Sequence, residues 1–135
     1  MLRLFVDDTL QTNDIARIYP DGSFTILGRK DNVINSGGIK VQAEEIERLL
    51  QSSIPVPFVI TSVPDRRLGQ AVTLLIEGQM EISALGTKLE SVLASYYRPK
   101  YIYTVNHIPQ TGNGKINRKE CRVLAESLQL LGRQE

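Results

Sequence analysis

The sequence is poor in the residues that build metal sites and disulfide-bonded folds. It has 1 cysteine, 1 histidine and no tryptophan among 135 residues. One cysteine cannot form an internal disulfide, and together with one histidine it cannot complete the tetrahedral ligand set of a structural zinc site. We therefore expect no metal site within the chain itself and a reducing, cytoplasmic setting.

An excess of charge of one sign and long apolar runs are also lacking. The 16 Lys and Arg residues nearly balance the 15 Asp and Glu residues, so the formal net charge is +1 and provides no general attraction for nucleic acid. Apolar stretches such as 72–76 are far too short to span a bilayer, and the run that follows Met1 ends too early for a secretory signal. The remaining composition, 41% hydrophobic and 23% charged, is ordinary for one soluble domain.

Alternating apolar patterns and turn signals predict an α+β fold. Asp21-Gly22 between two alternating flanks is typical of a tight hairpin turn with positive φ angles. Paired glycines at 37 and 38 indicate a turn or a close backbone approach. After the hairpin, the predicted order is β-α-β-β-α-β-α, a small mixed sheet of about three strands packed with about three helices. The strand candidates are a short one at 32–35 and longer ones at 58–63, 71–77 and 101–105, and the first helix is expected at 42–52.

Capping residues and helical spacing predict how the two later helices begin and pack. Ser83 is the expected cap of one helix, and Asn117 with Glu120 resembles the capping box that opens the other. Tyr96 and Leu131 are expected on the buried faces of these helices. The same reasoning places four tyrosines in the core rather than against nucleobases: Tyr96, Tyr97, Tyr101 and Tyr103.

The segment Gly-Asn-Gly-Lys-Ile-Asn-Arg at 112–118 is the richest candidate for chemistry. Lys115 would project from a glycine-flanked loop as a point charge, which suits a phosphate or carboxylate oxygen on which charge develops. A solvated lysine in a surface turn is the alternative. The segment is not a Walker A loop, because Pro109 stands in the place of that motif's first glycine and Ile116 follows the lysine where Ser or Thr is required.

Four other polar positions have a functional and a structural interpretation. Arg29 could contact an anion beside a flexible connector, or belong to a polar loop that joins two strands. Asp14 could accept hydrogen bonds from ligand hydroxyls or from nearby backbone donors. Arg66-Arg67 forms a solvated basic turn or contacts phosphates. His107 has no catalytic partner in the sequence and is interpreted as structural.

The order of these segments resembles the C-terminal motifs of the adenylate-forming superfamily, which includes acyl- and aryl-CoA synthetases, peptide-synthetase adenylation domains and luciferases. The resemblance runs from about residue 12 to residue 125. Its specific parts are Gly-Arg-Lys-Asp at 28–31 with Glu45-Ile46-Glu47, and Pro-Gln-Thr-Gly-Asn-Gly-Lys-Ile-Asn-Arg at 109–118. It implies a hairpin and the end of a large domain at 1–28, including a strand remnant near the start, a hinge at 29–31 and a C-terminal lid at 32–135.

The resemblance also implies roles for the residues of the first half-reaction. Lys115 matches the lysine that bridges the substrate carboxylate and the ATP α-phosphate while an acyl-adenylate forms. Asp14 matches the aspartate that binds the ribose hydroxyls, although Asn13 replaces the glycine usual before it. Arg29 matches an arginine that helps to hold the nucleotide. ATP and its magnesium would be held mostly by a large N-terminal adenylation domain outside this chain.

For the second half-reaction the resemblance implies a rotation and a thiol channel. Asp31 matches the hinge about which the lid rotates, and Gly37 and Gly38 match the loop that then lines the tunnel for the pantetheine arm of coenzyme A. The Ser-Gly-Gly form at 36–38 looks more like CoA ligases than peptide synthetases. Residues 31–41 are similar to o-succinylbenzoate–CoA ligases of menaquinone synthesis.

Three alternatives stay open at this point. The chain could be the lid of a ligase for another small carboxylic acid, or a stand-alone module that binds CoA or an acyl carrier. It could also be a small RNA-binding α+β domain, against which the charge balance counts. As a lid, the isolated chain is expected to be inactive.

Overall fold

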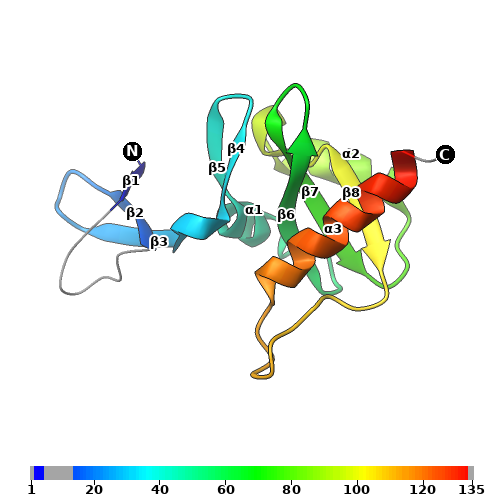
Figure 1. Cartoon of the computed structure of the whole chain (residues 1–135). Coiled ribbons are helices and arrows are strands. Elements are labelled where there is room, and N and C mark those ends of the chain that lie inside the picture. Colours follow the sequence, from blue (N-terminus) through cyan, green and yellow to red (C-terminus); the bar gives the residue numbers. More distant parts are fainter. Residues whose placement is uncertain (1, 5–13, 134–135) are drawn as a thin grey trace.

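A computed structural model describes residues 2–4 and 14–133, which form two β-sheets and three α-helices (Figure 1). The predicted α+β class is confirmed. Thr12 and Asn13 of the resemblance, and Phe5 and Val6 of the expected strand remnant, lie outside the described residues. No helix in the described part of the chain is long and apolar enough to cross a membrane.

The first sheet contains β1 (Leu2–Leu4), β2 (Asp14–Ile18) and β3 (Phe24–Arg29), all antiparallel. The predicted hairpin joins β2 to β3, but its turn differs from the expected one. Only Gly22, at φ 92°, has a positive φ, so Asp21 does not adopt the left-handed conformation. Pro20 precedes Asp21 and fixes its own φ near the value that an ordinary type I turn requires. The Asp21 carboxylate instead accepts hydrogen bonds from the N–H and the hydroxyl of Ser23.

A short connector leads from the first sheet to a second hairpin. The 3-10 turn η1 (Lys30–Asn32) is followed by β4 (Val33–Ser36) and β5 (Ile39–Gln42). Gly37 and Gly38 form the turn between these strands, with φ angles of 62° and 86°. Two consecutive positive φ angles define a type I′ turn, in which a residue with a side chain is strained.

The second sheet is mixed and has five strands, two more than expected. Its order is β5-β4-β7-β6, with β8 (Tyr101–Val105) parallel to β7 (Gly69–Glu77) and β6 (Phe58–Asp65) antiparallel to β7. The predicted short strand at 32–35 corresponds to β4, whereas β5 was not among the predicted strands. The β4–β5 hairpin joins the sheet where Ser36 pairs with Gly69.

Helices cover both faces of this sheet (Figure 1). α1 (Ala43–Leu50) and α2 (Ile82–Val92) pack on one face, and α3 (Arg118–Arg133) packs on the other. Successive residues of a strand point to opposite faces, so Val72, Leu74 and Ile76 enter the α1–α2 core while Ala71 and Leu75 enter the α3 core.

Three predictions about the helices were wrong in detail. Ser83 lies inside α2, whose cap position is Glu81, and the Ser83 hydroxyl bonds to that carboxylate. Tyr96 belongs to the short 3-10 turn η2 (Ser95–Tyr97) and is 51% exposed, because α2 has already ended at Val92. Leu131 is 59% exposed. The other three tyrosines pack against the two core clusters, as predicted.

Candidate functional site

Lys115 lies in a closed loop between β8 and α3. The N–H of Thr111 donates to the Lys115 carbonyl at 2.7 Å, and the N–H of Gly114 donates to the Thr111 carbonyl at 3.0 Å. Gln110 and Ile116 form a β-bridge at the base of the loop. Gly114 has φ 80°, a conformation that favours glycine. The lysine is exposed, and its loop is fixed by backbone bonds on both sides.

Asn117 connects this loop rigidly to α3. Its side-chain oxygen accepts the N–H of Glu120 at 3.1 Å, which confirms it as the cap of α3. The Asn117 N–H donates to the Pro109 carbonyl at 2.9 Å, so only half of the predicted capping box forms. The position of Lys115 is therefore set by the start of the helix and by the segment that precedes the loop.

The Gly37-Gly38 turn lies at the other end of the second sheet from the Lys115 loop (Figure 1). The Gly37 N–H donates to the Leu68 carbonyl at 2.8 Å, which anchors the turn to the β6–β7 turn. A Cβ on residue 37 would lie 3.0 Å from the Leu68 side chain, whereas a Cβ on residue 38 would meet nothing within 4 Å. The space beside Gly38 is therefore open, whereas Gly37 packs against Leu68.

Asp14 and Arg29 are brought together by the register of β2 and β3, in which they pair directly. The Arg29 Nη1 and Asp14 Oδ1 atoms are 3.9 Å apart, and the two side chains are 46% and 20% exposed. At this distance an ion pair contributes little to stability. The Arg29 side chain is the more exposed of the two, and the Asp14 side chain is partly buried.

Asp31 lies exposed in the η1 connector, between Arg29 and Asn32, which both donate hydrogen bonds to Glu44 of α1. The Glu44 carboxylate accepts the Arg29 N–H at 3.0 Å, the Asn32 side-chain amide at 2.9 Å and the Gln42 side-chain amide at 2.7 Å. Burial acts to raise the pKa of Glu44, but these three hydrogen bonds outweigh it and lower the pKa. The carboxylate is thus held in its charged form beside the connector.

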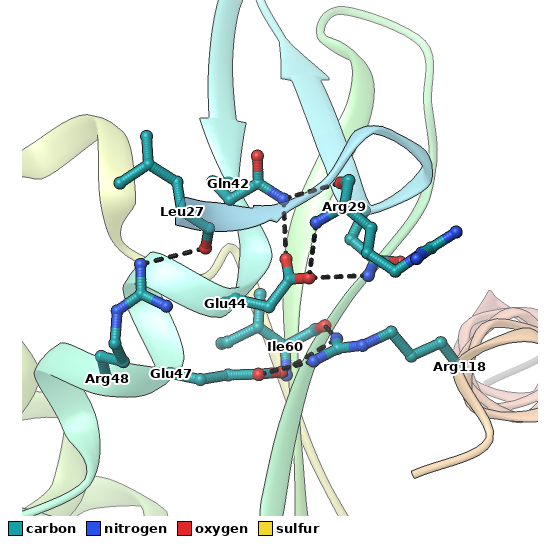
Figure 2. Close-up of polar contacts among 9 residues, drawn as sticks. Leu27, Arg29, Gln42, Glu44, Glu47, Arg48, Ile60 and Arg118 are labelled. Atoms are coloured by element: carbon teal, nitrogen blue, oxygen red, sulfur yellow. Dashed lines mark hydrogen bonds and ion pairs between the residues drawn. The ribbon is translucent and has the colours of Figure 1, made fainter. Parts of the chain in front are cut away.

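The two glutamates of Glu45-Ile46-Glu47 join different parts of the chain. Glu45 accepts from Arg17 of β2 at 2.9 Å and from the Tyr97 hydroxyl at 3.1 Å. Glu47 accepts from Arg118 at 2.7 and 3.1 Å and from the Ile60 N–H at 2.9 Å (Figure 2). Glu45 therefore binds the first sheet, and Glu47 binds the start of α3.

A groove runs between the connector and the first turns of α3. Two predicted site residues, Arg29 and Asp31, line it together with Ile116, which follows Lys115. Gly37 and Gly38 do not line it. Its lining includes Arg29, Asp31, Asn32, Ile116, Arg118 and Lys119. Its other lining residues include Arg122, Glu44 and Glu126, so the basic side chains of the groove stand among carboxylates.

Other reactive side chains of the described region show no arrangement for catalysis. His107 is 89% exposed at its side chain and lies 3.9 Å from Glu77. Burial raises the pKa of the Cys121 thiol to about 11, so this cysteine is unreactive. No group of three or more His, Cys, Asp or Glu residues within 2–4 and 14–133 is placed to hold a metal ion.

Sequence reasoning missed the residues that position the site rather than form it. The sequence assigned no positioning role to Gln42 or Glu44 and included Arg118 only as part of the segment 112–118, yet each of these side chains bonds to backbone or to a charged partner. The only sequence signal was the density of acidic residues at 44–47 beside the Gly-Arg-Lys-Asp segment.

Comparisons with known proteins converge on one group of enzymes, although no family model matches the chain. Triostin synthetase I of Streptomyces triostinicus is 38% identical over 126 residues, which are 90% of this chain and 24% of that protein. The 2-succinylbenzoate–CoA ligase of Lactococcus lactis is 33% identical over 113 residues, 83% of this chain and 25% of that protein.

Two solved structures have a similar fold and share more than a quarter of the aligned residues with this chain. An acyl-CoA synthetase (AMP-forming)/AMP-acid ligase II-like protein of Dyadobacter fermentans is 29% identical with a TM-score of 0.64, covering 89% of this chain and 40% of that one. The anthranilate–CoA ligase AuaEII in complex with anthranoyl-AMP is 27% identical with a TM-score of 0.71, covering 88% of this chain and 25% of that one.

The chain spans about a quarter of the length of the curated relatives it matches. The motifs, the fold and the relatives agree in the part of the enzyme they identify. This chain is homologous to the C-terminal domain of the adenylate-forming CoA ligases.

Proposed function

We propose that the chain is the C-terminal lid of an ATP-dependent acyl- or aryl-CoA ligase that works in the cytoplasm. The reaction joins a carboxylic acid to ATP, which gives an acyl-adenylate and pyrophosphate, and then transfers the acyl group to the thiol of coenzyme A with release of AMP. One observation carries the proposal: the lysine loop and the Gly37-Gly38 turn are fixed to opposite ends of one sheet, and a short connector joins that sheet to β1–β3.

Lys115 is the catalytic residue of the first step. A carboxylate and a polyphosphate must approach each other although both are negative, and a fixed ammonium between them offsets this repulsion. The backbone bonds at Thr111 and the cap at Asn117 hold the lysine loop in place before the substrates arrive. By analogy with other preorganised donors, the loss of this charge should cost about 3–4 kcal/mol of transition-state stabilisation.

Asp14 and Arg29 are the nucleotide-binding pair of this step. The Asp14 carboxylate suits the two hydroxyls of a ribose, and the Arg29 guanidinium suits a phosphate oxygen. The strand register supports this pairing of roles, because it places the two side chains 3.9 Å apart on neighbouring strands. A larger adenylation domain would hold most of the ATP and its magnesium, since the relatives are about four times as long as the match.

In the second step the thiol must reach the carbonyl that Lys115 faced, so the lysine has to withdraw. Rotation about Asp31 would exchange the two ends of the lid at the reaction centre. Gly37 and Gly38 would then line the path of the pantetheine arm, and the open space beside Gly38 supports this role. The same geometry requires that the chain alone forms no acyl-adenylate.

The two half-reactions of the complete enzyme test the proposal. Lys115→Ala should lower pyrophosphate exchange by roughly two to three powers of ten, the rate equivalent of the energy above, and largely spare thioester formation from a supplied acyl-adenylate. Lys88→Ala, an exposed lysine on α2, is the matched control and should leave both steps unchanged. Equal losses in both steps would refute the role of Lys115. Tight binding of CoA by the isolated chain would instead favour a stand-alone binding module.

For the acid, we propose o-succinylbenzoate as the first substrate to test. Support comes from the form of residues 31–41 and from the similarity to the 2-succinylbenzoate–CoA ligase of Lactococcus lactis. The relatives also include a ligase for 4-chlorobenzoate. A panel of aromatic and aliphatic acids in the pyrophosphate-exchange assay decides between them, and a lack of turnover with o-succinylbenzoate alongside turnover of another acid would reject this assignment.

A further inference from the structure

Helix α1 and its cap residue Gln42 bond to the end of β3, which precedes the proposed hinge at Asp31. Three hydrogen bonds join α1 and its cap to residues before Asp31: Arg29 N–H to Glu44 at 3.0 Å, Gln42 Nε2 to the Arg29 carbonyl at 2.8 Å, and Arg48 to the Leu27 carbonyl at 3.0 Å (Figure 2). These bonds must break when the lid rotates about Asp31.

Glu44 has a second set of bonds that rotation leaves intact. The Asn32 amide at 2.9 Å and the Gln42 amide at 2.7 Å both belong to the rotating side of Asp31. The carboxylate therefore keeps two donors in either orientation, and it gains the Arg29 N–H only in the orientation seen here. A charged acceptor that never loses all its partners can release the first sheet without becoming a buried, unpaired charge.

The space that the Glu44 carboxylate occupies exists because residue 28 has no side chain. A Cβ on Gly28 would lie 2.4 Å from the Glu44 carboxyl carbon and 2.5 and 2.6 Å from its oxygens. The Gly28 backbone has φ 159°, a conformation that residues with a side chain rarely adopt, so the backbone and the carboxylate both favour glycine here. The carboxylate cannot simply swing aside, because three donors hold it.

We propose that Glu44 is a positioning residue that latches the first sheet to α1 in one of the two orientations of the lid. Gly28 leaves the space that the Glu44 carboxylate occupies. The latch acts through the Arg29 backbone and so also sets the position of the Arg29 side chain beside Asp14. The inference rests on the proposed function, since a latch of this kind serves a lid that alternates.

Amide exchange in the 135-residue chain tests the latch directly. Gln42 donates to Glu44 Oε1, whereas Arg29 and Asn32 donate to Oε2. In Glu44→Gln one of these oxygens is replaced by an amide NH2 and the other becomes an uncharged acceptor, so the hydrogen bond from the Arg29 N–H weakens. We expect exchange of the Arg29 amide to rise roughly tenfold or more, as the loss of a hydrogen bond to a charged group implies, while the β7 amides keep their protection. Glu90→Gln, the same change at an exposed position of α2, is the control and should alter neither. An unchanged Arg29 amide, or equal changes at Arg29 and in β7, would overturn the proposal.

Gly28→Ala tests the same latch from its opposite side. The added methyl should displace the carboxylate and raise Arg29 exchange as Glu44→Gln does. In a Glu44→Ala background the space is empty and only the strain of the Gly28 backbone remains, so Gly28→Ala should raise Arg29 exchange less than it does when Glu44 is present. Additive effects of the two alanine substitutions would show that residues 28 and 44 act separately and would overturn the pairing.

Spin labels measure the orientation itself. Thr25→Cys on β3 and Thr87→Cys on α2 are exposed, and the native Cys121 is fully buried, so labels attach selectively. The distance distribution should be narrow with Glu44 and should gain a second population in Glu44→Gln; identical distributions would overturn the latch. No acid, ATP or CoA takes part in these measurements, so they succeed or fail independently of the ligase assignment.

Discussion

Replacing Glu47 by glutamine should destabilise the fold more than any change at an exposed glutamate. Glu47 receives both arms of the Arg118 guanidinium, at 2.7 and 3.1 Å, and the Ile60 N–H at 2.9 Å. It thereby joins α1, β6 and the first residue of α3. Burial acts to lower the pKa of Arg118, but the hydrogen bonds and charge of Glu47 raise it, so the guanidinium is charged in the fold.

The magnitude follows from the contacts and their exposure. Glutamine keeps an oxygen for the Ile60 N–H but loses the ion pair, and hydrogen bonds to charged groups contribute about 1.5–3 kcal/mol each. The side chains of Arg118 and Glu47 are 28% and 16% exposed, so water partly replaces the lost bonds. We expect a loss of about 2–3 kcal/mol in the free energy of unfolding, which for a chain of this size lowers Tm by roughly 6–10 °C.

Urea unfolding of the chain measures this loss, with Glu90→Gln on the exposed face of α2 as the matched control. A double-mutant cycle with Arg118→Gln isolates the pair, and the double variant should be less destabilised than the sum of the single variants. A loss below about 0.5 kcal/mol for Glu47→Gln, or strict additivity in the cycle, would refute the reasoning.

Two further predictions concern the turns that bound β7 and β4. Asp65 accepts from Lys100 at 2.6 Å and from the N–H groups of Leu68 and Arg67, and these bonds lower its pKa from 3.8 to about 2. Because the pKa of Asp65 is lower in the folded than in the unfolded chain, its charged carboxylate stabilises the fold above about pH 4, and this stabilisation is lost as the pH falls to about 2. In Asp65→Asn the free energy of unfolding, measured by urea titration, should therefore fall less steeply between pH 4 and pH 2. The same steepness in both proteins would contradict this. Gly38→Ala should cost about 1–2 kcal/mol for its left-handed backbone, and Gly37→Ala should cost more because its methyl also approaches Leu68 at 3.0 Å; equal losses in thermal unfolding would contradict the contact.

The elements that local chemistry controls were predictable from the sequence. Two adjacent glycines permit positive φ angles at both positions, and the turn at 37–38 has them. Asn117 caps α3 because its side chain reaches an N–H three residues away. The turn at Asp21 was less predictable because the fixed φ of Pro20 favours an ordinary type I turn over the mirror-image turn that Asp-Gly alone predicts.

Helix packing was harder to predict because spacing alone does not fix which residues a sheet accepts. α3 buries the small side chains of Cys121 and Ala125 against the sheet, whereas Leu131 extends past it. Small residues allow the helix to approach closely, but hydrophobic spacing gives more weight to the leucines.

The candidate site follows the same division between local and distant contacts. The pairing of Asp14 with Arg29 follows from one hairpin register. The bond between Arg118 and Glu47 joins residues 71 positions apart, and the one between Arg29 and Glu44 spans 15. Contacts of this kind depend on how the sheet and helices assemble, so a local sequence pattern does not predict them.

The anchoring of the two ligand loops has a consequence for engineering. The Gly37-Gly38 turn is tied to Leu68, and the lysine loop is tied to Pro109 and the cap of α3. Each loop therefore has its own supports. Under the proposed function, we expect that residues 36–39 exchanged for those of an enzyme with a different thiol acceptor would leave the lysine loop in its present conformation.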